Sequence, residues 1–238
     1  MTDRFQRTKL LLGEEKFNML SDARVLIFGL GGVGGYTAEA LARGGIGSLT
    51  LVDGDKVDIT NINRQIIADD NTVGQMKASA FKDRIKLINP NCVCTAVNSF
   101  YTAENQDTIG FSKFDYIVDA IDTVSSKLLI IERAKREGIP VISAMGTARK
   151  LDPTLLKIGD IYDTSGCPLA RVMRRELRRR GIDKLTVVWS SEEPIMPGGD
   201  RGRDAPIGSV SFVPSVAGLY IAGKVISDIA GTGGLYGR

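Results

Sequence analysis

The sequence contains no histidine among its 238 residues, and it has three cysteines and one tryptophan. Without histidine the chain lacks the commonest general base, the usual activator of a nucleophile and the commonest zinc ligand. Cys92, Cys94 and Cys167 form neither a disulfide framework nor a paired C-x-x-C zinc site. Cys92 and Cys94 fit one face of a strand as small buried residues. Catalysis by this chain therefore has to rely on charge and positioning.

The chain also lacks a strong excess of charge and a targeting segment. Its net charge is +3, so affinity for nucleic acid has to come from a local patch. The composition, 43% hydrophobic and 25% charged, is typical of globular proteins. The first apolar run carries charges, unlike a signal peptide. Residues 205–223 are uncharged but contain two prolines and three glycines, which favours a buried C-terminal helix over a membrane span. We expect a reducing, cytoplasmic location.

A glycine cluster follows the first apolar run. Gly29, Gly31 and Gly34 fit G-x-G-x-x-G, Gly32 lies between them, and a second apolar run ends at Asp53, 19 residues after Gly34. Glycine permits a tight turn and lets a phosphate approach the backbone, and the helix that follows points N–H groups at the anion. The pattern predicts a nucleotide site with Asp53 at the ribose. On these residues alone NAD fits as well as ATP, and glycines that serve only the turn also fit.

Apolar runs alternate with helical patterns and predict an α/β fold. The expected strands are 24–28, 48–52, 93–97, 116–120, 140–144, 155–158, 185–189 and 210–213. The expected helices are 4–20 (one or two), 34–42, 74–88, 125–137, 168–180 and 215–229. This order predicts a doubly wound, mostly parallel sheet with an antiparallel C-terminal extension. We expect one domain over 1–238, in which 1–146 form the nucleotide-binding core with an N-terminal helical arm and 147–238 an elaboration with a mobile loop at 192–206.

Phosphate-binding side chains follow the second and fourth strands. The long loop after the second strand carries Asn61, Arg64 and Gln65, Lys77 opens the next helix, and Asp122 follows a central strand. Arg64 can donate two hydrogen bonds to a phosphate, and Asp122 can hold Mg²⁺, which triphosphate chemistry requires and hydride transfer does not. Singly, each fits an ordinary solvated side chain or helix cap. Their convergence at one edge of the sheet favours ATP.

Five motifs resemble, in order and spacing, those of the ubiquitin-activating-type, ThiF/MoeB-like adenylation family. They are GLGGVG at 29–34, LVDGD at 51–55, NINRQ at 61–65, GQMK at 74–77 and AIDT at 120–123. The resemblance implies that Mg-ATP binds this fold and that AMP is transferred to a carboxylate. The implied ATP-binding residues are Gly29, Gly31, Gly32, Val33, Gly34, Asp53, Asp55, Asn61, Arg64, Gln65, Lys77 and Asp122. It implies Arg64, Lys77 and Asp122 as catalytic, Asp122 as the Mg²⁺ ligand, and Arg7 as an arginine that crosses a homodimer into the partner's site.

The second half resembles one branch of that family, the tRNA threonylcarbamoyladenosine dehydratases. The matching stretches are 143–154, 159–182, 187–194 and 208–223. The resemblance implies that the threonyl carboxylate of N6-threonylcarbamoyladenosine in the anticodon loop is adenylated and then attacked from within the same side chain, which closes a ring. Because the nucleophile is internal, no enzyme cysteine is needed. Cys167, outside the apparent core, is expected to be a free, non-catalytic thiol.

Three alternatives stay open on the sequence. An activator of a ubiquitin-like sulfur-carrier protein shares the ATP site, although such activators usually carry the C-x-x-C pairs that are absent here. A second alternative is a catalytically inactive family member that serves as a protein-binding module. The presence of Arg64, Lys77 and Asp122 argues against it, because these are the residues that the resemblance implies for catalysis. An NAD(P) oxidoreductase comes last. Whether a sulfur-acceptor protein or a cysteine desulfurase binds the chain is not decided by the sequence.

One predicted helix carries a dense cluster of arginines. The cluster consists of Arg171, Arg174, Arg175, Arg178, Arg179 and Arg180. Leu169, Met173 and Leu177 form its buried stripe, and Glu176 is its single acid. Such a density is typical of a phosphate-backbone footprint, although a solvated basic face is the ordinary alternative. We expect tRNA to bind at Arg171, Arg174, Arg175, Arg178 and Arg179, with Arg201 and Arg203 of the mobile loop joining them.

Overall fold

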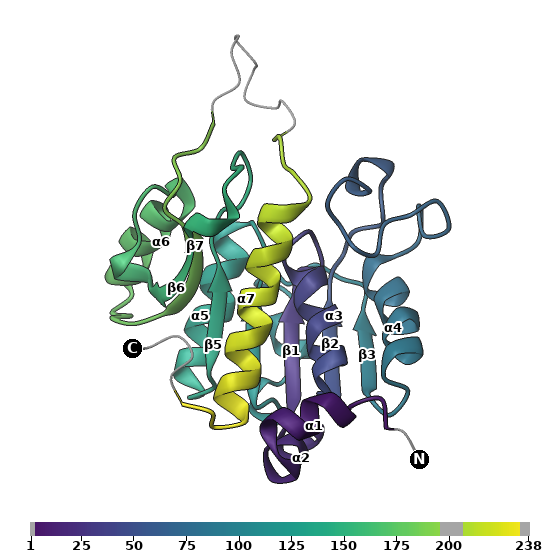
Figure 1. The fold of residues 1–238 in the computed structure, drawn as a ribbon. Helices are drawn as coiled ribbons and strands as arrows, with labels where there is room; N and C mark the ends of the chain where they lie inside the picture. Colours follow the sequence, from purple (N-terminus) through teal and green to yellow (C-terminus); the bar gives the residue numbers. More distant parts are fainter. Residues whose placement is uncertain (1–2, 196–206, 234–238) are drawn as a thin grey trace.

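One seven-stranded sheet runs through the described part of the chain, with the strand order β3-β2-β1-β4-β5-β7-β6 (Figure 1). The structure, a computed structural model, describes residues 3–195 and 207–233. The strands are β1 (Arg24–Phe28), β2 (Ser48–Val52), β3 (Val93–Val97), β4 (Tyr116–Asp119), β5 (Val141–Ala144), β6 (Leu156–Asp160) and β7 (Thr186–Ser190). Neighbouring strands are parallel except for β6, which runs antiparallel to β7. The predicted doubly wound sheet and its antiparallel extension are confirmed.

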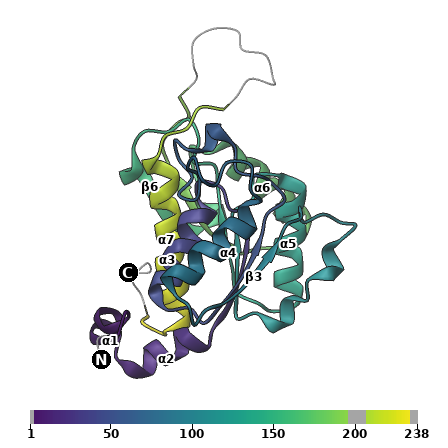
Figure 2. The same ribbon diagram turned by 90° about the vertical axis from the view of Figure 1, so that its right-hand side faces the viewer.

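Helices cover both faces of this sheet. They are α1 (Gln6–Leu12), α2 (Glu14–Asp22), α3 (Gly34–Gly44), α4 (Lys77–Ile88), α5 (Val124–Arg136), α6 (Pro168–Arg179) and α7 (Phe212–Ile229). α3, α4 and α7 pack on one face, and α5 and α6 pack on the other (Figures 1 and 2). The apolar residues divide accordingly into two buried clusters, one on each side of the strands.

The first two helices lie at the edge where the parallel strands begin (Figure 1). Phe17 of α2 is buried against Gly45, which follows α3. The backbone N–H of Gly47 donates to the carbonyl of Leu20, and no Cβ would fit on Gly47 because it would lie 1.7 Å from the carbonyl oxygen of Ser21. The arm is thus anchored to the edge of the sheet that lies away from the carboxyl ends of the strands.

α7 is long and apolar enough, by length and composition, to cross a membrane. In this fold it instead packs lengthwise against α3. Gly218 allows the close approach, because a Cβ there would lie 2.3 Å from the carbonyl oxygen of Val33, and the Thr37 hydroxyl donates to the Gly218 carbonyl (3.1 Å). Val213, Ile221 and Val225 are fully buried. The prediction of a buried C-terminal helix is confirmed.

One predicted strand and the predicted start of one helix are wrong. The strand expected at 210–213 does not form, since α7 already begins at Phe212 and accommodates Pro214 in its first turn, where no N–H is needed. α4 begins at Lys77 instead of residue 74, because Gly74 has φ +88° and Met76 is extended and bridges to Lys56. The predicted mobile loop lies largely outside the described residues, as do Arg201 and Arg203.

Candidate active site

A cleft of about 530 Å³ opens at the carboxyl ends of β1, β2, β4 and β5. Ligands of doubly wound sheets bind at this edge, where the strand order reverses. All predicted ATP-binding residues except Gly34 line the cleft. The long loop after β2 and the segment that precedes α7 form its outer wall. The sequence motifs therefore converge in space as expected.

The glycines of the turn have two different roles. Gly29 has φ +83°, and a Cβ on it would lie 2.7 Å from the carbonyl oxygen of Ala120, which directly follows the neighbouring strand β4. Gly34 lies behind the turn, where a Cβ would lie 1.8 Å from the carbonyl oxygen of Gly29. Gly31 faces open space in the cleft, with the nearest atom, Nε2 of Gln65, 3.9 Å from a Cβ. Gly29 and Gly34 shape the turn, and Gly31 leaves room for a ligand.

Asp53 is 9% exposed and joins the glycine turn to the end of β2. One carboxylate oxygen accepts a hydrogen bond from the N–H of Leu30 (2.7 Å), and the other accepts one from the N–H of Asp55 (2.8 Å). Burial raises the pKa of the Asp53 carboxyl, although both N–H groups and Lys77 oppose that rise. The residue expected at the ribose thus also fixes the position of the phosphate-binding turn.

Two cations enter the cleft from different elements. Lys77, at the start of α4, is 5% exposed, and its ammonium group lies 2.9 Å from a carboxylate oxygen of Asp55. Arg64 donates from one guanidinium nitrogen to the carbonyl of Thr60 and the side chain of Asn63, both at 3.0 Å. Its remaining N–H groups can bind phosphate oxygens. The two positive charges therefore line one cleft, an arrangement that suits the phosphate groups of a nucleotide.

The loop that carries these groups is ordered by its own hydrogen bonds. Asp58 and Asn61 form a capping box around the 3₁₀-helix Ile59–Asn61, and the Val57 N–H donates to the Gln75 carbonyl (2.8 Å). Gln65 is 6% exposed, and its Oε1 has no hydrogen-bond partner within residues 3–195 and 207–233. A buried unpaired amide oxygen is costly unless a ligand donates to it. Gln65 therefore fits a ligand-binding role in the cleft.

A buried ion pair lies beneath the turn that carries Asp122. Lys127 and Asp119 are both fully buried, and their charged atoms are 2.9 Å apart. The Lys127 ammonium also donates to the Ile121 carbonyl (2.9 Å), and Asp119 accepts from the Ile121 N–H (3.3 Å). The Ser143 hydroxyl of β5 donates to Asp119 (2.5 Å). The peptide groups on both sides of Ile121 are thereby fixed directly before Asp122.

Sequence reasoning missed Lys127, although a signal was present. Lys127, Ile130, Ile131 and Ala134 recur at helical spacing, which places the lysine on the buried face of α5. A lysine on such a face requires a buried acid. The acid itself, Asp119, was visible at the end of the fourth strand, but the sequence does not show that the two meet.

Asp122 is exposed in the cleft, and it suits a cation that arrives with a nucleotide. Among the described residues no group of three or more histidine, cysteine, aspartate or glutamate side chains could hold a metal ion. Mg²⁺ at nucleotide sites commonly uses one or two carboxylates together with phosphate oxygens and water. The single carboxylate therefore fits Mg²⁺ bound with ATP better than a resident metal site.

The cleft continues past the phosphate end between β5 and the start of α6. This second part is lined by Met145, Gly146, Thr147, Ala148, Leu169, Ile207 and Ser209. The Asn63 amide donates to the Ser209 carbonyl (3.1 Å), which joins the phosphate-binding loop to this part. The cleft thus extends beyond the predicted ATP-binding residues, and we refer to this second part as its acceptor end.

Several predicted residues lie outside the cleft. Arg7 is exposed on α1, at the opposite edge of the sheet (Figure 1), so within one chain it does not reach the site. Cys167 is 4% exposed and belongs to the buried cluster beneath α6, so its expected place outside the core is wrong. It is a free thiol, as predicted. Cys92 and Cys94 are half-buried, and burial raises their pKa values to about 11 and about 12.

The predicted arginines of α6 differ in their surroundings. Arg174 is half-buried and donates to the backbone carbonyl (2.8 Å) and the hydroxyl of Thr164. Arg175 and Arg179 contact Glu176 at 3.1 and 3.2 Å, and the guanidinium of Arg178 lies 5.0 Å from the ring centre of Tyr162. The expected basic surface exists, but part of the Arg174 guanidinium is engaged inside the fold.

Comparisons with known proteins agree with this geometry. The chain is 42% identical over 242 residues to the tRNA threonylcarbamoyladenosine dehydratase of Bacillus subtilis, covering 96% of this chain and 95% of that protein. It superimposes on the crystal structure of E. coli tRNA N6-threonylcarbamoyladenosine dehydratase, TcdA, in complex with AMP with a TM-score of 0.89, at 34% identity over 96% of this chain and 94% of that chain.

The same E. coli protein in complex with ATP matches with a TM-score of 0.86, 34% identity and the same coverage of both chains. The molybdopterin-synthase adenylyltransferase of E. coli is 35% identical over only 124 residues, which cover 52% of this chain and 49% of that protein. The likeness to the dehydratases thus extends over both halves of the chain.

The model of the ThiF family matches residues 5–235. This range includes the glycine turn, the phosphate-binding loop, the acceptor end of the cleft and α6. The mostly parallel sheet with helices on both faces matches the fold of the E. coli dehydratase. The chain belongs to the ThiF family.

Proposed function

We propose that this chain is an ATP-dependent tRNA threonylcarbamoyladenosine dehydratase. It adenylates the threonyl carboxylate of N6-threonylcarbamoyladenosine in the anticodon loop and then closes the side chain to the cyclic form. The observation that carries the proposal is the two-part cleft, in which a phosphate end with Arg64, Lys77 and Asp122 is continuous with an acceptor end at Gly146. The likeness to named dehydratases over nearly the full length supports the same activity.

The chemistry needs no histidine. A carboxylate oxygen of the substrate attacks the α-phosphorus of ATP, and the bond to pyrophosphate breaks. A nucleophile within the same side chain then attacks the acyl carbon and AMP leaves, so the oxygen lost from the substrate departs on AMP. Arg64 and Lys77 stabilise the negative charge that accumulates on the phosphate oxygens. The second step is intramolecular, and correct orientation in the cleft is sufficient to accelerate it.

The remaining parts of the proposed site concern ATP, Mg²⁺ and the partner subunit. Phe100, 60% exposed and packed over Gly54, offers an aromatic wall beside Asp53 for the adenine. Mg²⁺ held by Asp122 would neutralise phosphate charge.

We propose a homodimer in which Arg7 completes the partner's site, supported by the exposed Leu10 and Leu11 on α1. We place the protein in the cytoplasm.

The test is direct. The chain is incubated with ATP, Mg²⁺ and tRNA that carries threonylcarbamoyladenosine. The tRNA is then digested, and the masses of its nucleosides are measured by mass spectrometry. The proposal requires loss of one water mass together with release of AMP. An unchanged nucleoside mass would overturn it, and AMP release that depends on a small carrier protein instead of tRNA would favour the sulfur-carrier activator.

For Arg7, mixing Arg7→Ala chains with Arg64→Ala chains should restore activity, because a mixed dimer then contains one intact site.

A further inference from the structure

The solvent face of α6 carries a line of three arginines that starts beside the cleft. Arg171, Arg175 and Arg178 are separated by four and three residues, which places them on one side of the helix. All three are exposed, and they lie opposite the buried Met173 and Leu177. We refer to these three residues as the arginine stripe. At 1.5 Å per residue it spans about 10 Å along the helix.

The stripe is connected to the cleft at one end. Leu169, in the first turn of α6, lines the acceptor end of the cleft, and Arg171 follows two residues later. Among the described residues Arg171 makes no ion pair within 4.0 Å, so its charge is available to a ligand. Residues two positions apart project from nearly opposite sides of a helix, so Leu169 faces the cleft while Arg171 lies on the solvent side of the same first turn. An RNA strand that passes from the cleft around this turn reaches Arg171 first, then Arg175 and then Arg178.

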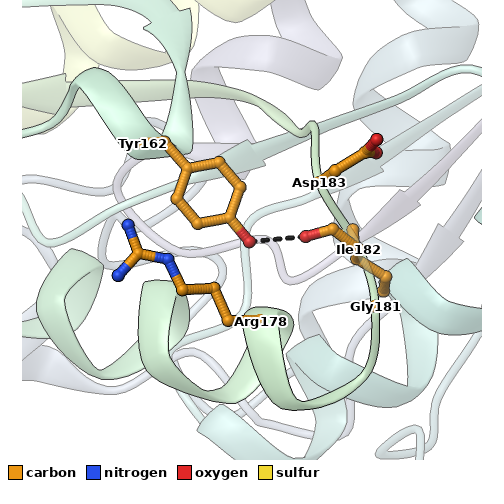
Figure 3. Close-up of a pocket in the computed structure, with 5 residues that line it drawn as sticks. All are labelled: Tyr162, Arg178, Gly181, Ile182 and Asp183. Atoms are coloured by element: carbon orange, nitrogen blue, oxygen red, sulfur yellow. Dashed lines mark hydrogen bonds between the residues drawn. The ribbon is translucent and has the colours of Figure 1, made fainter.

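The other end of the stripe is a second pocket, of about 320 Å³, lined by Tyr162, Arg178, Gly181, Ile182 and Asp183 (Figure 3). Tyr162 belongs to the 3₁₀-helix Ile161–Asp163, and its hydroxyl donates to the Ile182 carbonyl, which fixes the ring. The Arg178 guanidinium is held over that ring at 5.0 Å from its centre. Burial raises the pKa of Tyr162, so the phenol stays neutral. A fixed aromatic ring with a stacked guanidinium suits an unpaired nucleotide.

The other charged residues of the helix do not extend this line. Glu176 contacts Arg175, Arg179 and Arg180, so the only acid of α6 is surrounded by cations. Arg174 is bound to Thr164 inside the fold. No large apolar side chain of α6 is among the exposed ones in the described chain. A protein partner usually needs an apolar core at its interface, whereas a polyanion needs only accessible cations. The surface therefore favours nucleic acid.

We propose that the arginine stripe and the Tyr162–Arg178 pocket bind one strand of the substrate tRNA beside the modified nucleotide in the cleft. The proposal rests on the proposed function and adds to it a second anchoring point, Tyr162, and a direction for the RNA strand. Phosphates lie along Arg171 and Arg175, and an unpaired nucleotide stacks at the pocket. Arg174 has a structural role and lies outside this path.

The first experiment measures tRNA binding as a function of salt concentration. The variant R171Q/R175Q is compared with K82Q/K86Q, which removes two exposed cations from α4 on the opposite face of the sheet. R171Q/R175Q should bind tRNA about tenfold more weakly, and the slope of log affinity against log salt should become shallower by about 0.7 for each phosphate that is no longer neutralised. K82Q/K86Q should keep the wild-type slope. Equal slopes in both variants would overturn the proposal.

The second experiment tests the pocket. Tyr162→Ala should weaken binding of a single-stranded anticodon-loop RNA by about five- to a hundredfold, which is the range for loss of one stacked base. Tyr162→Phe keeps the ring and should bind nearly as well as the wild type. ATP binding, measured by calorimetry, should be unchanged in both variants and shows that they fold. Equal RNA binding by the Ala and Phe variants would overturn the assignment of the pocket.

The outcomes separate this proposal from the proposed function. At saturating tRNA the stripe variants should dehydrate the substrate at the wild-type maximal rate, since only KM depends on the stripe. A wild-type protein that never dehydrates tRNA contradicts the proposed function. If the wild-type protein dehydrates tRNA and the stripe and pocket variants keep the wild-type KM, only the RNA path proposed here is contradicted. The path is also contradicted if these variants bind a protein partner more weakly but bind tRNA as well as the wild type does.

Discussion

The cleft and the arginine stripe both present positive charge, but the fold holds the two sets of side chains differently. In the cleft, Lys77 is 5% exposed and paired with Asp55, and the turn before Asp122 is fixed by the buried pair of Asp119 and Lys127. In the stripe, Arg171 and Arg175 extend from one helix face into solvent. The cleft is built from contacts between distant segments, whereas the positions of Arg171 and Arg175 depend only on the helix that carries them.

This difference matches what each region has to do. Groups that stabilise a transition state act at short range and have to be positioned before the reaction begins. Cations that attract a phosphate backbone act at longer range and tolerate movement. Substitutions in the cleft should therefore damage folding or the chemical step, and substitutions in the stripe should change only tRNA affinity and its dependence on salt. The stripe variants described above test one side of this contrast, and four predictions test the side of the cleft.

The largest expected effect follows from removing the buried cation. Lys127→Met leaves Asp119 charged and unpaired in the core, and breaking a buried ion pair in this way typically costs about 3–5 kcal/mol. The free energy of unfolding, measured with urea, should fall by that amount. The variant should also lose catalytic rate at temperatures where it is still folded, because the Ile121 carbonyl loses its donor.

A double variant shows whether the loss of stability in Lys127→Met comes from the unpaired charge of Asp119 or from the loss of the lysine itself. Asp119→Asn combined with Lys127→Met removes both charges. The asparagine oxygen can still accept from the Ile121 N–H, and its amide nitrogen can donate to the Ser143 hydroxyl oxygen in place of the hydrogen bond that Asp119 accepts there. The double variant should be more stable than Lys127→Met alone, since no uncompensated charge remains. If both variants lose the same stability, the positioning of the Asp122 turn does not depend on charge pairing.

Removing the cleft arginine should affect the reaction and not the fold. The hydrogen bonds of Arg64 to Thr60 and Asn63 are solvent-exposed, so Arg64→Ala should change the free energy of unfolding by less than about 1 kcal/mol. The rate of adenylate formation should fall by about a hundred- to a thousandfold, as for loss of one transition-state donor. Release of pyrophosphate from ATP measures this rate. Arg136→Ala, exposed in the last turn of α5, serves as the matched control.

A third prediction separates glycines that shape the turn from the glycine that makes room for the ligand. Gly34→Ala forces a Cβ against the Gly29 carbonyl, and an inserted carbon in a tight site costs about 1–3 kcal/mol or more. Gly31→Ala meets no atom closer than 3.9 Å, so its melting temperature should stay close to that of the wild type while ATP binds more weakly. Equal loss of stability in both variants would contradict this division of roles.

The sequence predicted the cleft well because its groups sit at strand ends, and parallel strands bring their carboxyl ends to one edge. Gly29, Asp53, Arg64 and Asp122 could all be placed in this way. The burial of Lys127 against Asp119 could not be predicted, since the two residues meet only after α5 docks beneath β4.

The same limit explains the errors elsewhere. The strand expected at 210–213 is the start of α7, where packing against α3 outweighs the β propensity of a short valine-rich run. Arg174 looked equivalent to its neighbours, but the Thr164 carbonyl comes within hydrogen-bond distance only in the folded chain. Cys167 was expected outside the core, yet it is buried in the apolar cluster beneath α6. Local patterns predicted elements and faces, and contacts between distant segments decided the rest.

The smallest expected effect concerns the thiols, and it tests whether the cleft works by charge alone. At pH 7 a thiol with a pKa of about 11, such as Cys92, is thiolate in roughly one molecule in ten thousand. Alkylation of native protein should therefore be slow at Cys92 and Cys94, and burial should protect Cys167, whereas urea should expose all three.

Cys167→Ser is the decisive variant, because the sulfur atom lies 3.6 Å from where a Cβ on Gly146 of the cleft wall would be. If charge and orientation suffice, this variant should dehydrate tRNA within about twofold of the wild-type rate at temperatures where it stays folded, since the buried hydroxyl lowers stability and not the chemical step. Loss of both dehydration and AMP release, with pyrophosphate release retained, would mean that the thiol attacks the acyl-adenylate and expels AMP before ring closure. The internal attack proposed here would then be wrong.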